Sequence, residues 1–451
     1  MSIGDVRRGE LPKGWVRVSL RDVCAAVARA EPRTVFKDTF EYVDISSIDP
    51  KTRTITEPRT ISVNEAPSRA RQILKGDDVL FSTVRPYLRN IAHVEKSLDG
   101  QFASTGFSVI RPADGICGRY LFHLVNSNAF VATVLPFQRG SSYPAVLDED
   151  VKAIEIPIPP TAEQERIVAA LDALFTRLDV AEMGLHRSRL LAGRYRSAIL
   201  HAAISGELGK GAQEGLRNET IGSLFDVQTG ATPIRSEARY YEGGTIPWLT
   251  SASVNTDPIS EAHQFITDAA IRETNCKLFP AGSLLIAMYG EGTTRGKVAA
   301  LGIDAATNQA CAVLVPRAAD SVMCRFVKLW FQYRYEALRG ISSGGVQPNL
   351  NTGLIKKLAI RVPSGGQVAS VVSCAEGLLA EADSIDERVT DALGGITVFR
   401  QSVLAAAFRG ELVPQDPNDE PVEKLLERIR SRRAAEMPAK RPSRKSRKAA
   451  A

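Results

Sequence analysis

The sequence predicts a mixed α+β protein made of two similar halves, each a globular domain followed by a long helix. Three observations predict it. Similar phrases recur 204 residues apart, short apolar β-like runs lie inside each half, and a long stretch with heptad spacing closes each half. We therefore expect two globular domains separated by two long antiparallel coiled-coil helices, related by a pseudo-twofold internal repeat.

The repeat is clearest where YRSAILHAAISGEL (Tyr195–Leu208) returns as FRQSVLAAAFRGEL (Phe399–Leu412). Half of these positions are identical, among them the pair Arg196 and Arg400. The alignment extends backwards without a gap: VKAIEIPIPP at 151–160 matches IKKLAIRVPS at 355–364. A gapless match of this length indicates an internal duplication with a period of half the chain.

A chain of 451 residues is too long for a single core, which also favours at least two domains. Inside each half, short apolar runs such as 78–84 and 283–288 are typical of buried strands. The expected organisation is a first globular domain over 1–160, a first long helix over 161–208, a second globular domain over 209–363, a second long helix over 364–412, and a short helix with a basic disordered tail over 413–451.

The first long helix opens after Pro160 with Thr161-Ala-Glu-Gln164, which fits a capping box. In both helices apolar or small residues alternate at spacings of four and three, which predicts a seam between two paired helices of roughly 60 Å at 1.5 Å per residue. The alternative is an amphipathic helix packed on its own domain. Gly206 and Gly410 are expected to cap the two helix ends. The residues expected in the seam are Ile167, Leu171, Leu174, Leu178, Leu185, Ile199, Val371, Leu378, Ile385, Val389, Ile396, Phe399 and Val403.

The net charge of +6 is unevenly distributed along the chain. Residues 428–448 hold ten Lys or Arg and one acid, which leaves the rest of the chain at −3. If that body binds nucleic acid, its basic groups must gather on one face. The basic end is expected to be solvated, and contact with DNA or RNA is the alternative.

No apolar run reaches membrane-spanning length, and the start MSIGDVRRGELPKGW lacks the apolar core of a signal peptide. We expect a cytoplasmic protein with no membrane partner. The cysteines form no Cys-x-x-Cys pair, which indicates reduced and mostly buried thiols. They are Cys24, Cys117, Cys276, Cys311, Cys324 and Cys374.

The sequence does not match the motifs of common enzyme classes. In GEGTTRGKV, three residues separate Gly292 from Gly296 where a phosphate-binding P-loop needs four, and Val298 stands in place of Ser or Thr. No methyltransferase motif is visible, and we expect no catalytic residues and no metal site. The histidines form no metal-binding pair; they are His93, His123, His186, His201 and His263.

Several phrases, in their order and duplication, carry a family resemblance over essentially the whole chain. They are LPKGW, GDDVLFSTVRPYLRN and IPIPPTAEQERIVAALDAL in the first half, and ATP, YYEGGTIPWLT, AGSLLIAMYGEGTTRGKVA, QPNLN and FRQSVLAAAFRGELVPQDPNDEPVEKLLERI in the second. The chain resembles the specificity (S) subunits of type I restriction-modification systems, the HsdS family. The second helix begins PSGGQVASVV and lacks the AEQERIV phrase, so docking on that side is expected to be less typical.

The resemblance implies a non-catalytic subunit of a restriction and methyltransferase complex. Each globular domain would be a target-recognition domain that reads one part of a bipartite, asymmetric sequence in double-stranded DNA. The paired helices would act as a spacer and as the docking site for two modification (methyltransferase) subunits, which restriction (nuclease and translocase) subunits join. S-adenosylmethionine, ATP and Mg²⁺ would belong to those partners, and the chain would hold no cofactor of its own.

Reading DNA requires side chains that offer donors and acceptors to base edges, with Lys or Arg on phosphates. Polar stretches occupy matching places in the two halves; the alternative is that they are ordinary polar loops. The first domain contributes Ser82, Thr83, Arg85, Tyr87, Arg89, Gln138, Arg139, Ser141, Ser142 and Tyr143. The second contributes Tyr289, Thr293, Thr294, Arg295, Lys297, Asn308, Gln309, Ser342, Ser343, Gln347 and Asn349.

Two other functions stay open at this point. One is a DNA-processing enzyme, such as a nuclease, with an unrecognised site in one half. The other is a coiled-coil scaffold that binds only proteins.

Overall fold

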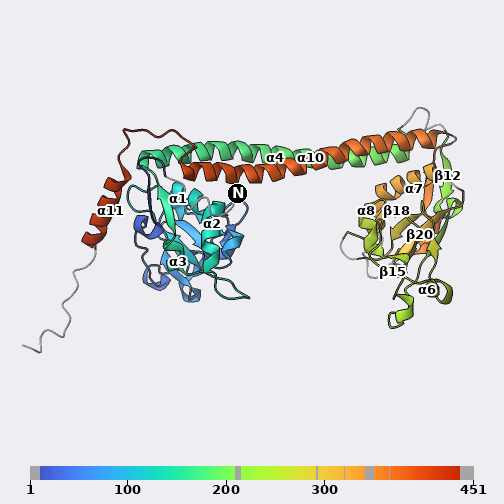
Figure 1. The fold of residues 1–451 in the computed structure, drawn as a ribbon, viewed down its shortest axis with the longest axis horizontal. Helices are drawn as coiled ribbons and strands as arrows, with labels where there is room; N and C mark the ends of the chain where they lie inside the picture. Colours follow the sequence, from blue (N-terminus) through green and yellow to red (C-terminus); the bar gives the residue numbers. More distant parts are fainter. Residues whose placement is uncertain are drawn as a thin grey trace, which may run out of the picture. The chain divides into compact units, whose positions relative to one another are not determined.

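A computed structural model describes residues 11–208, 215–290, 293–318, 320–340, 350–364 and 366–436 of the chain. The chain divides into two compact units. Unit 1 consists of Met1–Met183 with Ala392–Ala451, and unit 2 is the continuous segment Gly184–Asp391. Each unit contains one globular domain and a part of each of two long helices, α4 and α10 (Figure 1).

The globular part of unit 1 contains a four-stranded sheet in the order β5-β2-β9-β6, a three-stranded sheet β10-β7-β8, and the pairs β1-β11 and β3-β4. The strands are β1 (Val16–Ser19), β2 (Thr39–Val43), β3 (Ile48–Asp49), β4 (Thr54–Ile55), β5 (Arg59–Ser62), β6 (Ala70–Ile73), β7 (Val79–Ser82), β8 (Ile91–His93), β9 (Phe102–Ser104), β10 (Phe107–Ile110) and β11 (Glu155–Ile158). The helices are α1 (Gly118–Val125), α2 (Asn128–Val134) and α3 (Asp148–Lys152).

The globular part of unit 2 contains the sheets β15-β14-β19-β16 and β13-β20-β17-β18 and the pair β12-β21. The strands are β12 (Arg217–Thr220), β13 (Phe225–Thr229), β14 (Ile246–Leu249), β15 (Phe265–Ile266), β16 (Leu278–Phe279), β17 (Leu284–Ala287), β18 (Val298–Ala300), β19 (Ala305–Thr307), β20 (Cys311–Pro316) and β21 (Ala359–Val362). The helices are α5 (Ile221–Leu224), α6 (Asp268–Glu273), α7 (Ser321–Tyr333), α8 (Tyr335–Gly340) and α9 (Thr352–Lys357).

The two units share one topology. The sheet β5-β2-β9-β6 of unit 1 corresponds to β15-β14-β19-β16 of unit 2. In both, the two central strands are parallel to each other, and each outer strand is antiparallel to its neighbour. In the other sheet, β7 lies between β10 and β8 as β17 lies between β20 and β18. The predicted α+β class and internal repeat are therefore confirmed.

The central strands are buried because their sequences are apolar on both faces. All four residues of β7 (VLFS) and all four of β17 (LLIA) are buried. In unit 1, α1 packs on β7 and β8, and in unit 2, α7 packs on β18. These apolar runs are the ones that the sequence identified as strands.

Helices α4 (Thr161–Ser205) and α10 (Gln367–Arg409) lie side by side and antiparallel (Figure 1). Within unit 1, Arg400 of α10 forms an ion pair with Asp179 of α4 at 2.5 Å. Within unit 2, Arg196 of α4 forms an ion pair with Asp383 of α10. Both members of the second pair lie 204 residues from their counterparts in the first, so the repeat extends to the ion pairs between the helices. The predicted antiparallel helix pair is confirmed.

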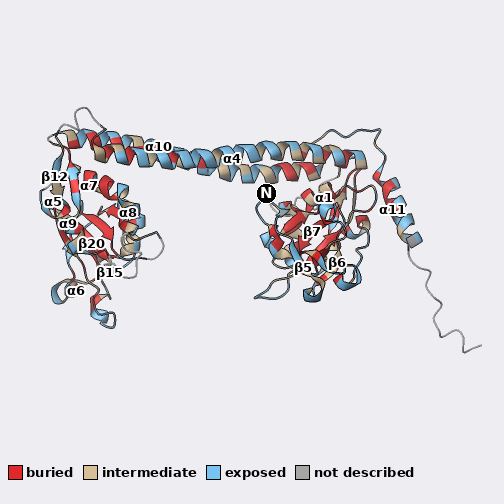
Figure 2. Ribbon diagram, turned by 180° about the vertical axis from the view of Figure 1, so that it is seen from behind, coloured by how far each residue is buried: buried red, intermediate tan, exposed pale blue. Residues whose placement is uncertain are grey.

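The helix ends pack into the domain cores, while exposed residues dominate the middle of both helices (Figure 2). Among the residues expected in the seam, the buried ones are Ile167, Leu171, Ile199, Val371, Val389 and Val403. Leu174, Leu178, Leu185, Leu378 and Ile396 are half-buried. Ile385 and Phe399 are exposed. Part of the heptad pattern therefore comes from packing against each domain, as the alternative interpretation held.

The start of α4 differs from the expected capping box. The Thr161 hydroxyl donates to the Gly115 carbonyl at 2.8 Å. The Gln164 side chain accepts from the Cys117 amide and donates to the Pro159 carbonyl, both at 2.9 Å. These side chains fasten the helix to the domain instead of capping free amides. At the other ends, Gly206 and Gly410 have positive φ angles of 81° and 75°, as expected of C-terminal caps.

The chain returns to the first domain after α10. Helix α11 (Val422–Glu436) places Val422, Leu425, Leu426 and Ile429 in the hydrophobic core of unit 1. Arg433 donates to the backbone carbonyls of Arg21 and Cys24 at 3.0 and 2.7 Å. The first half of the basic stretch is thus helical and packed, and residues 437–451 lie outside the described part of the chain.

Replacing Leu425 with Ala should lower the free energy of unfolding of unit 1 by about 2–5 kcal/mol, because it removes a buried side chain and leaves a cavity. Scanning calorimetry of the full chain would show the lower transition temperature. The exposed neighbour substitution E427A should change stability by less than about 0.5 kcal/mol. Equal stability of L425A and E427A would show that α11 does not contribute to the core.

Candidate nucleic-acid interface

In unit 1, the structure brings the two predicted polar stretches together. The loop after β7 and the segment 138–146 are joined by β-bridges from Val84 and Arg139 to Ala145. The Arg85 amide donates to the Pro144 carbonyl at 2.8 Å. Val84 and Ala145, which are 61 positions apart in the sequence, thus belong to one continuous surface element.

Arg85 is the central side chain of this element. Its backbone is left-handed, with φ of 48°, and its guanidinium lies 5.3 Å from the ring centroid of Tyr143. Its Nε atom is buried and has no hydrogen-bond partner in the described part of the chain. Tyr143 is 75% exposed and Tyr87 is 48% exposed. A guanidinium next to an accessible aromatic ring can hydrogen-bond to bases or phosphates, while the ring can stack on bases.

The other candidates in unit 1 fall into two groups. Ser82 and Thr83 are buried, and their hydroxyls donate to the carbonyls of Val84 and Gly106, both at 2.8 Å. These two hydroxyls shape the loop. The remaining candidates are exposed or half-buried. Arg139 pairs with Asp150 at 3.1 Å, and Arg89 bonds to Asn128. The Nε2 atom of Gln138 is buried without a partner among the described residues, whereas Ser141 and Ser142 are exposed.

In unit 2, the loop after β17 lies beside the turn at 308–310. The Tyr289 amide donates to the Ala310 carbonyl at 3.3 Å, and the Tyr335 hydroxyl donates to the Thr293 carbonyl at 2.5 Å. Arg295 is half-buried, and its buried Nε has no partner among the residues that the structure describes. Lys297 donates to Asn255 at 2.8 Å. Tyr289 and Thr293 are exposed and Thr294 is half-buried.

The turn itself is partly engaged by its own domain. Asn308 Oδ1 accepts from the Ala310 amide at 3.1 Å, and the exposed Gln309 accepts from the Thr232 hydroxyl at 2.6 Å. Thr232 was missed as a candidate because only the folded chain brings it next to Gln309. The candidates Ser342, Ser343, Gln347 and Asn349 lie outside the described residues.

Arg85 and Arg295 lie in corresponding loops, between β7 and β8 in unit 1 and between β17 and β18 in unit 2, although not at matching positions within them. Each is half-buried and has a buried Nε atom without a partner among the described residues. A buried donor without an acceptor costs about 1–3 kcal/mol. The shared feature therefore marks the same loop in both units as a place where a ligand acceptor is expected.

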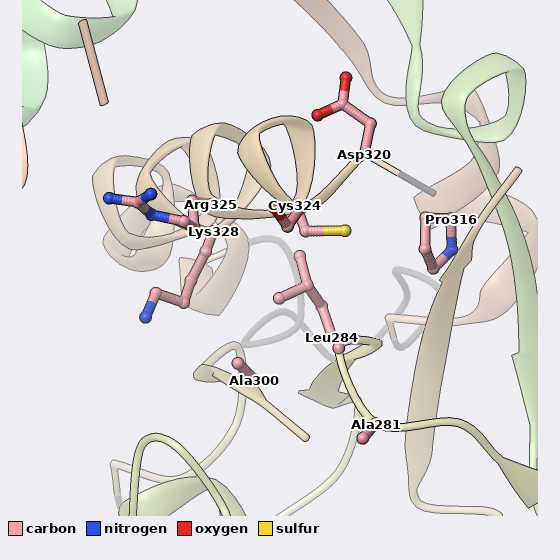
Figure 3. A pocket seen from close by; sticks show the side chains of 10 residues that line it. Ala281, Leu284, Ala300, Pro316, Asp320, Cys324, Arg325 and Lys328 are labelled. Carbon is pink, nitrogen blue, oxygen red and sulfur yellow. The ribbon is translucent and has the colours of Figure 1, made fainter. Parts of the chain in front are cut away.

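Unit 2 also contains a hollow of about 360 Å³ (Figure 3). Its cations are already paired, Arg325 with Glu376 and Lys328 with Asp257 at 2.9 Å. Burial raises the pKa of the Cys324 thiol to about 11, which keeps it protonated at neutral pH. Asp320 accepts from two amides at the start of α7. The groups around this hollow therefore form no activated nucleophile.

Within the described ranges, no cluster of three or more His, Cys, Asp or Glu side chains is arranged to hold a metal ion. No helix in the same ranges is both long and apolar enough to cross a bilayer. The six cysteines are unpaired, with Cys24, Cys276, Cys311 and Cys324 buried, Cys117 half-buried and Cys374 exposed.

Helix α4 is fastened to the globular part of unit 1 through a buried histidine. His123 of α1 lies 2.9 Å from Asp172 of α4 and packs edge-on against Phe175. Arg119 shares Asp172 at 2.7 Å. Burial lowers the pKa of His123, and the nearby Asp172 only partly opposes this effect.

This lowered pKa predicts a pH effect on stability. The unfolded state binds a proton at His123 near pH 6.5, before the folded state does, so the contribution is complete above about pH 6.5 and is lost as pH falls toward the folded pKa. The melting temperature should drop between pH 7.5 and 5.5, and the variant H123Q should show a smaller drop. An equal drop in both proteins would rule out His123 as the source.

The comparisons with known proteins agree with the internal repeat. The sequence profile described as type I restriction modification DNA specificity domain matches residues 12–185 and 214–368, one match for each half of the repeat. The chain belongs to this family. Specificity subunits recognise the DNA target of type I restriction systems and are not themselves catalytic, so both the family prediction and the prediction that the chain is not an enzyme are confirmed.

Three similar proteins illustrate the relationship. The StySPI specificity subunit of Salmonella potsdam is 24% identical over 457 residues, covering 95% of this chain and 97% of that protein. The HsdS subunit of Thermoanaerobacter tengcongensis is 28% identical with a TM-score of 0.62, covering 91% of this chain and all of that one. A chain from a structure describing complex assembly and conformational transition of a type I R-M system is 28% identical with a TM-score of 0.76, at 90% and 100% coverage.

Proposed function

We propose that this specificity subunit reads a bipartite, asymmetric DNA target, with one part of the target bound by each globular domain. The observation that carries the proposal is that corresponding loops of the two units, β7–β8 and β17–β18, each hold an arginine whose buried Nε has no partner among the described residues, Arg85 and Arg295. Their surroundings differ: Tyr87 and Tyr143 accompany Arg85, whereas Tyr289 and Lys297 lie near Arg295 in sequence. Equivalent loops with different side chains suit two unlike half-sequences.

We further propose that α4 and α10 set the gap between the two half-sequences. A paired helix is stiff, and the spacing of half-sites is a geometric quantity. Chemistry is assigned to the partners: modification subunits carry S-adenosylmethionine, and restriction subunits use ATP and Mg²⁺.

The purified chain alone, supplied with S-adenosylmethionine, ATP and Mg²⁺, should therefore neither methylate nor cleave DNA. Either activity would favour the alternative that the chain is an enzyme.

Exchanging residues 217–350 for the equivalent segment of a relative should change one half of the target and leave the other half and the gap unchanged. Mapping methylated positions in a host that carries the complete system would show both halves directly. A target changed in both halves would contradict the assignment of one domain to each half.

The single substitution R295Q should weaken binding to the native target by about 1–3 kcal/mol if Arg295 contacts a base.

The helix pair offers two equivalent surfaces for the modification subunits. Tyr195 of α4 in unit 2 is 41% exposed, and Phe399 of α10 in unit 1, at the equivalent repeat position, is 50% exposed. Other apolar side chains exposed on the same helices are Val180, Met183, Leu190, Leu191, Ile385 and Val398. Exposed aromatic side chains are common anchors of protein interfaces. Two such positions support two modification subunits for each chain.

The substitutions Y195A and F399A should each weaken binding of one modification subunit by at least about tenfold, because each removes an interface anchor. Native mass spectrometry of the assembled complex would count the bound subunits. The exposed helix residue Arg388 provides the control R388A, which should retain both subunits. Full assembly by Y195A and F399A, with unchanged affinity, would place the docking surface elsewhere.

A further inference from the structure

Arginine occupies left-handed backbone positions in unit 1 where the backbone itself disfavours it. Arg53, Arg85 and Arg89 have φ angles of 56°, 48° and 55°. This region suits Gly, Asn or Asp better than a long side chain. Arg53 ends the turn between β3 and β4, and its amide donates to the Asp49 carbonyl at 2.7 Å. The local conformation therefore does not explain why arginine stands there.

Arg53 is a half-buried cation without an acidic partner among the described residues. Its Nε atom is buried and unbonded, and no carboxylate of the described chain forms an ion pair with it. Burial and the nearby Arg89 and Arg400 lower its pKa to about 10, so it remains charged at neutral pH. A charge without a partner destabilises the folded state when it is removed from water. No contact of Arg53 among the described residues offsets this effect.

Two further arginines complete a cluster that we call the junction arginines: Arg53, Arg89 and Arg400. Arg89 bonds only to neutral groups, the Asn126 carbonyl at 3.4 Å and the Asn128 side chain. Arg400 is matched by Asp179 at 2.5 Å and Glu182 at 3.2 Å. The two uncompensated cations therefore both come from the recognition domain.

The nearest remaining charges do not neutralise the cluster. His123 and Arg119 face the same region, and both are engaged with Asp172, at 2.9 and 2.7 Å. That carboxylate is consequently already shared between two partners. The junction arginines keep an excess of positive charge.

The shared fold does not require this charge. The residue 204 positions after Arg53 is Asp257, an acid, whose carboxylate pairs with Lys328 at 2.9 Å and accepts from the Ala300 amide at 3.0 Å. Together with Arg196, the counterpart of Arg400, Asp257 lines a hollow of about 300 Å³ in unit 2. Near the counterpart of Arg400, unit 2 therefore carries an acidic side chain in place of an unpaired arginine.

We propose that Arg53 and Arg89 bind a phosphate of the DNA backbone beside the first half-sequence. The inference rests on the proposed function. Guanidinium groups suit phosphate because each offers several donors in one plane. Arg89 lies on the same loop as Arg85 and Tyr87, so DNA read by that loop brings its backbone to the cluster. An acidic side chain of a partner is less favoured, because the arginine on the helix is already matched by α4.

A phosphate contact fixes the register of the duplex and does not read sequence. The variant R53Q of the full chain should therefore bind the native target and a scrambled duplex more weakly by the same factor. Loss of one phosphate contact predicts about an eightfold loss at 100 mM monovalent salt and a salt slope smaller by about 0.9. Fluorescence anisotropy between 50 and 200 mM salt would measure both quantities.

The matched control is K51Q, which removes the same charge from an exposed residue of the same turn. It should leave the salt slope nearer to the wild-type value than R53Q does. The melting temperature of R53Q should equal or exceed that of the wild type, because an unpaired buried cation has been removed. A structural role for Arg53 would instead lower the melting temperature.

The proposal is wrong if R53Q keeps the wild-type affinity and slope, or if K51Q loses as much as R53Q, which would indicate bulk charge alone. It is also wrong if R53Q weakens binding of the modification subunit without DNA, which would assign the cluster to a protein acid. Failure of the wild-type chain to bind DNA would remove the proposed function as well. Normal wild-type binding with an unaffected R53Q would remove only the phosphate site.

Discussion

The structure depends on the antiparallel pairing of α4 and α10, because each domain core is completed by the start of one helix and the end of the other. In unit 1 the core takes in Ile167 and Leu171 from α4 and Leu404 from α10. In unit 2 it takes in Leu200 from α4 and Val371 from α10. Parallel helices could not supply both combinations within such units. The pseudo-twofold relation is thus a packing requirement as well as a trace of duplication.

Apolar burial at the helix ends carries more of the stability of this pairing than the charges do. The ion pairs of Arg196 and Arg400 have largely exposed acidic partners, and pairs of this kind contribute about 0–1 kcal/mol. Burial of one large apolar side chain contributes about 1.5–3 kcal/mol. We therefore infer that the ion pairs set the register of the two helices, while the domains hold the helix ends. The apolar side chains between the ends remain accessible.

Much of the fold could be predicted from the sequence, because strands such as β7 and β17 are apolar runs and the long helices keep a regular spacing. The heptad pattern could not separate a helix–helix seam from packing on a domain, since both favour the same spacing, and Phe399 fits the pattern while remaining exposed. Thr161 and Gln164 satisfied a local capping pattern but form tertiary hydrogen bonds instead. Arg53 stood in a polar turn, and only the fold reveals its burial beside two other arginines.

The arginines discussed above fall into two groups, those with a carboxylate partner and those without one. This division connects the fold to the function. Arginines with carboxylate partners, such as Arg196 and Arg400, hold structural elements together. Arg85 and Arg295 bury an unpartnered donor at the loops that follow the central strands. A buried donor without an acceptor destabilises the folded domain. Binding of DNA would remove this penalty, because phosphates and base edges supply acceptors. Under the proposed function, the near-neutral body of the chain binds DNA through a few uncompensated cations on these loops, without a large overall charge.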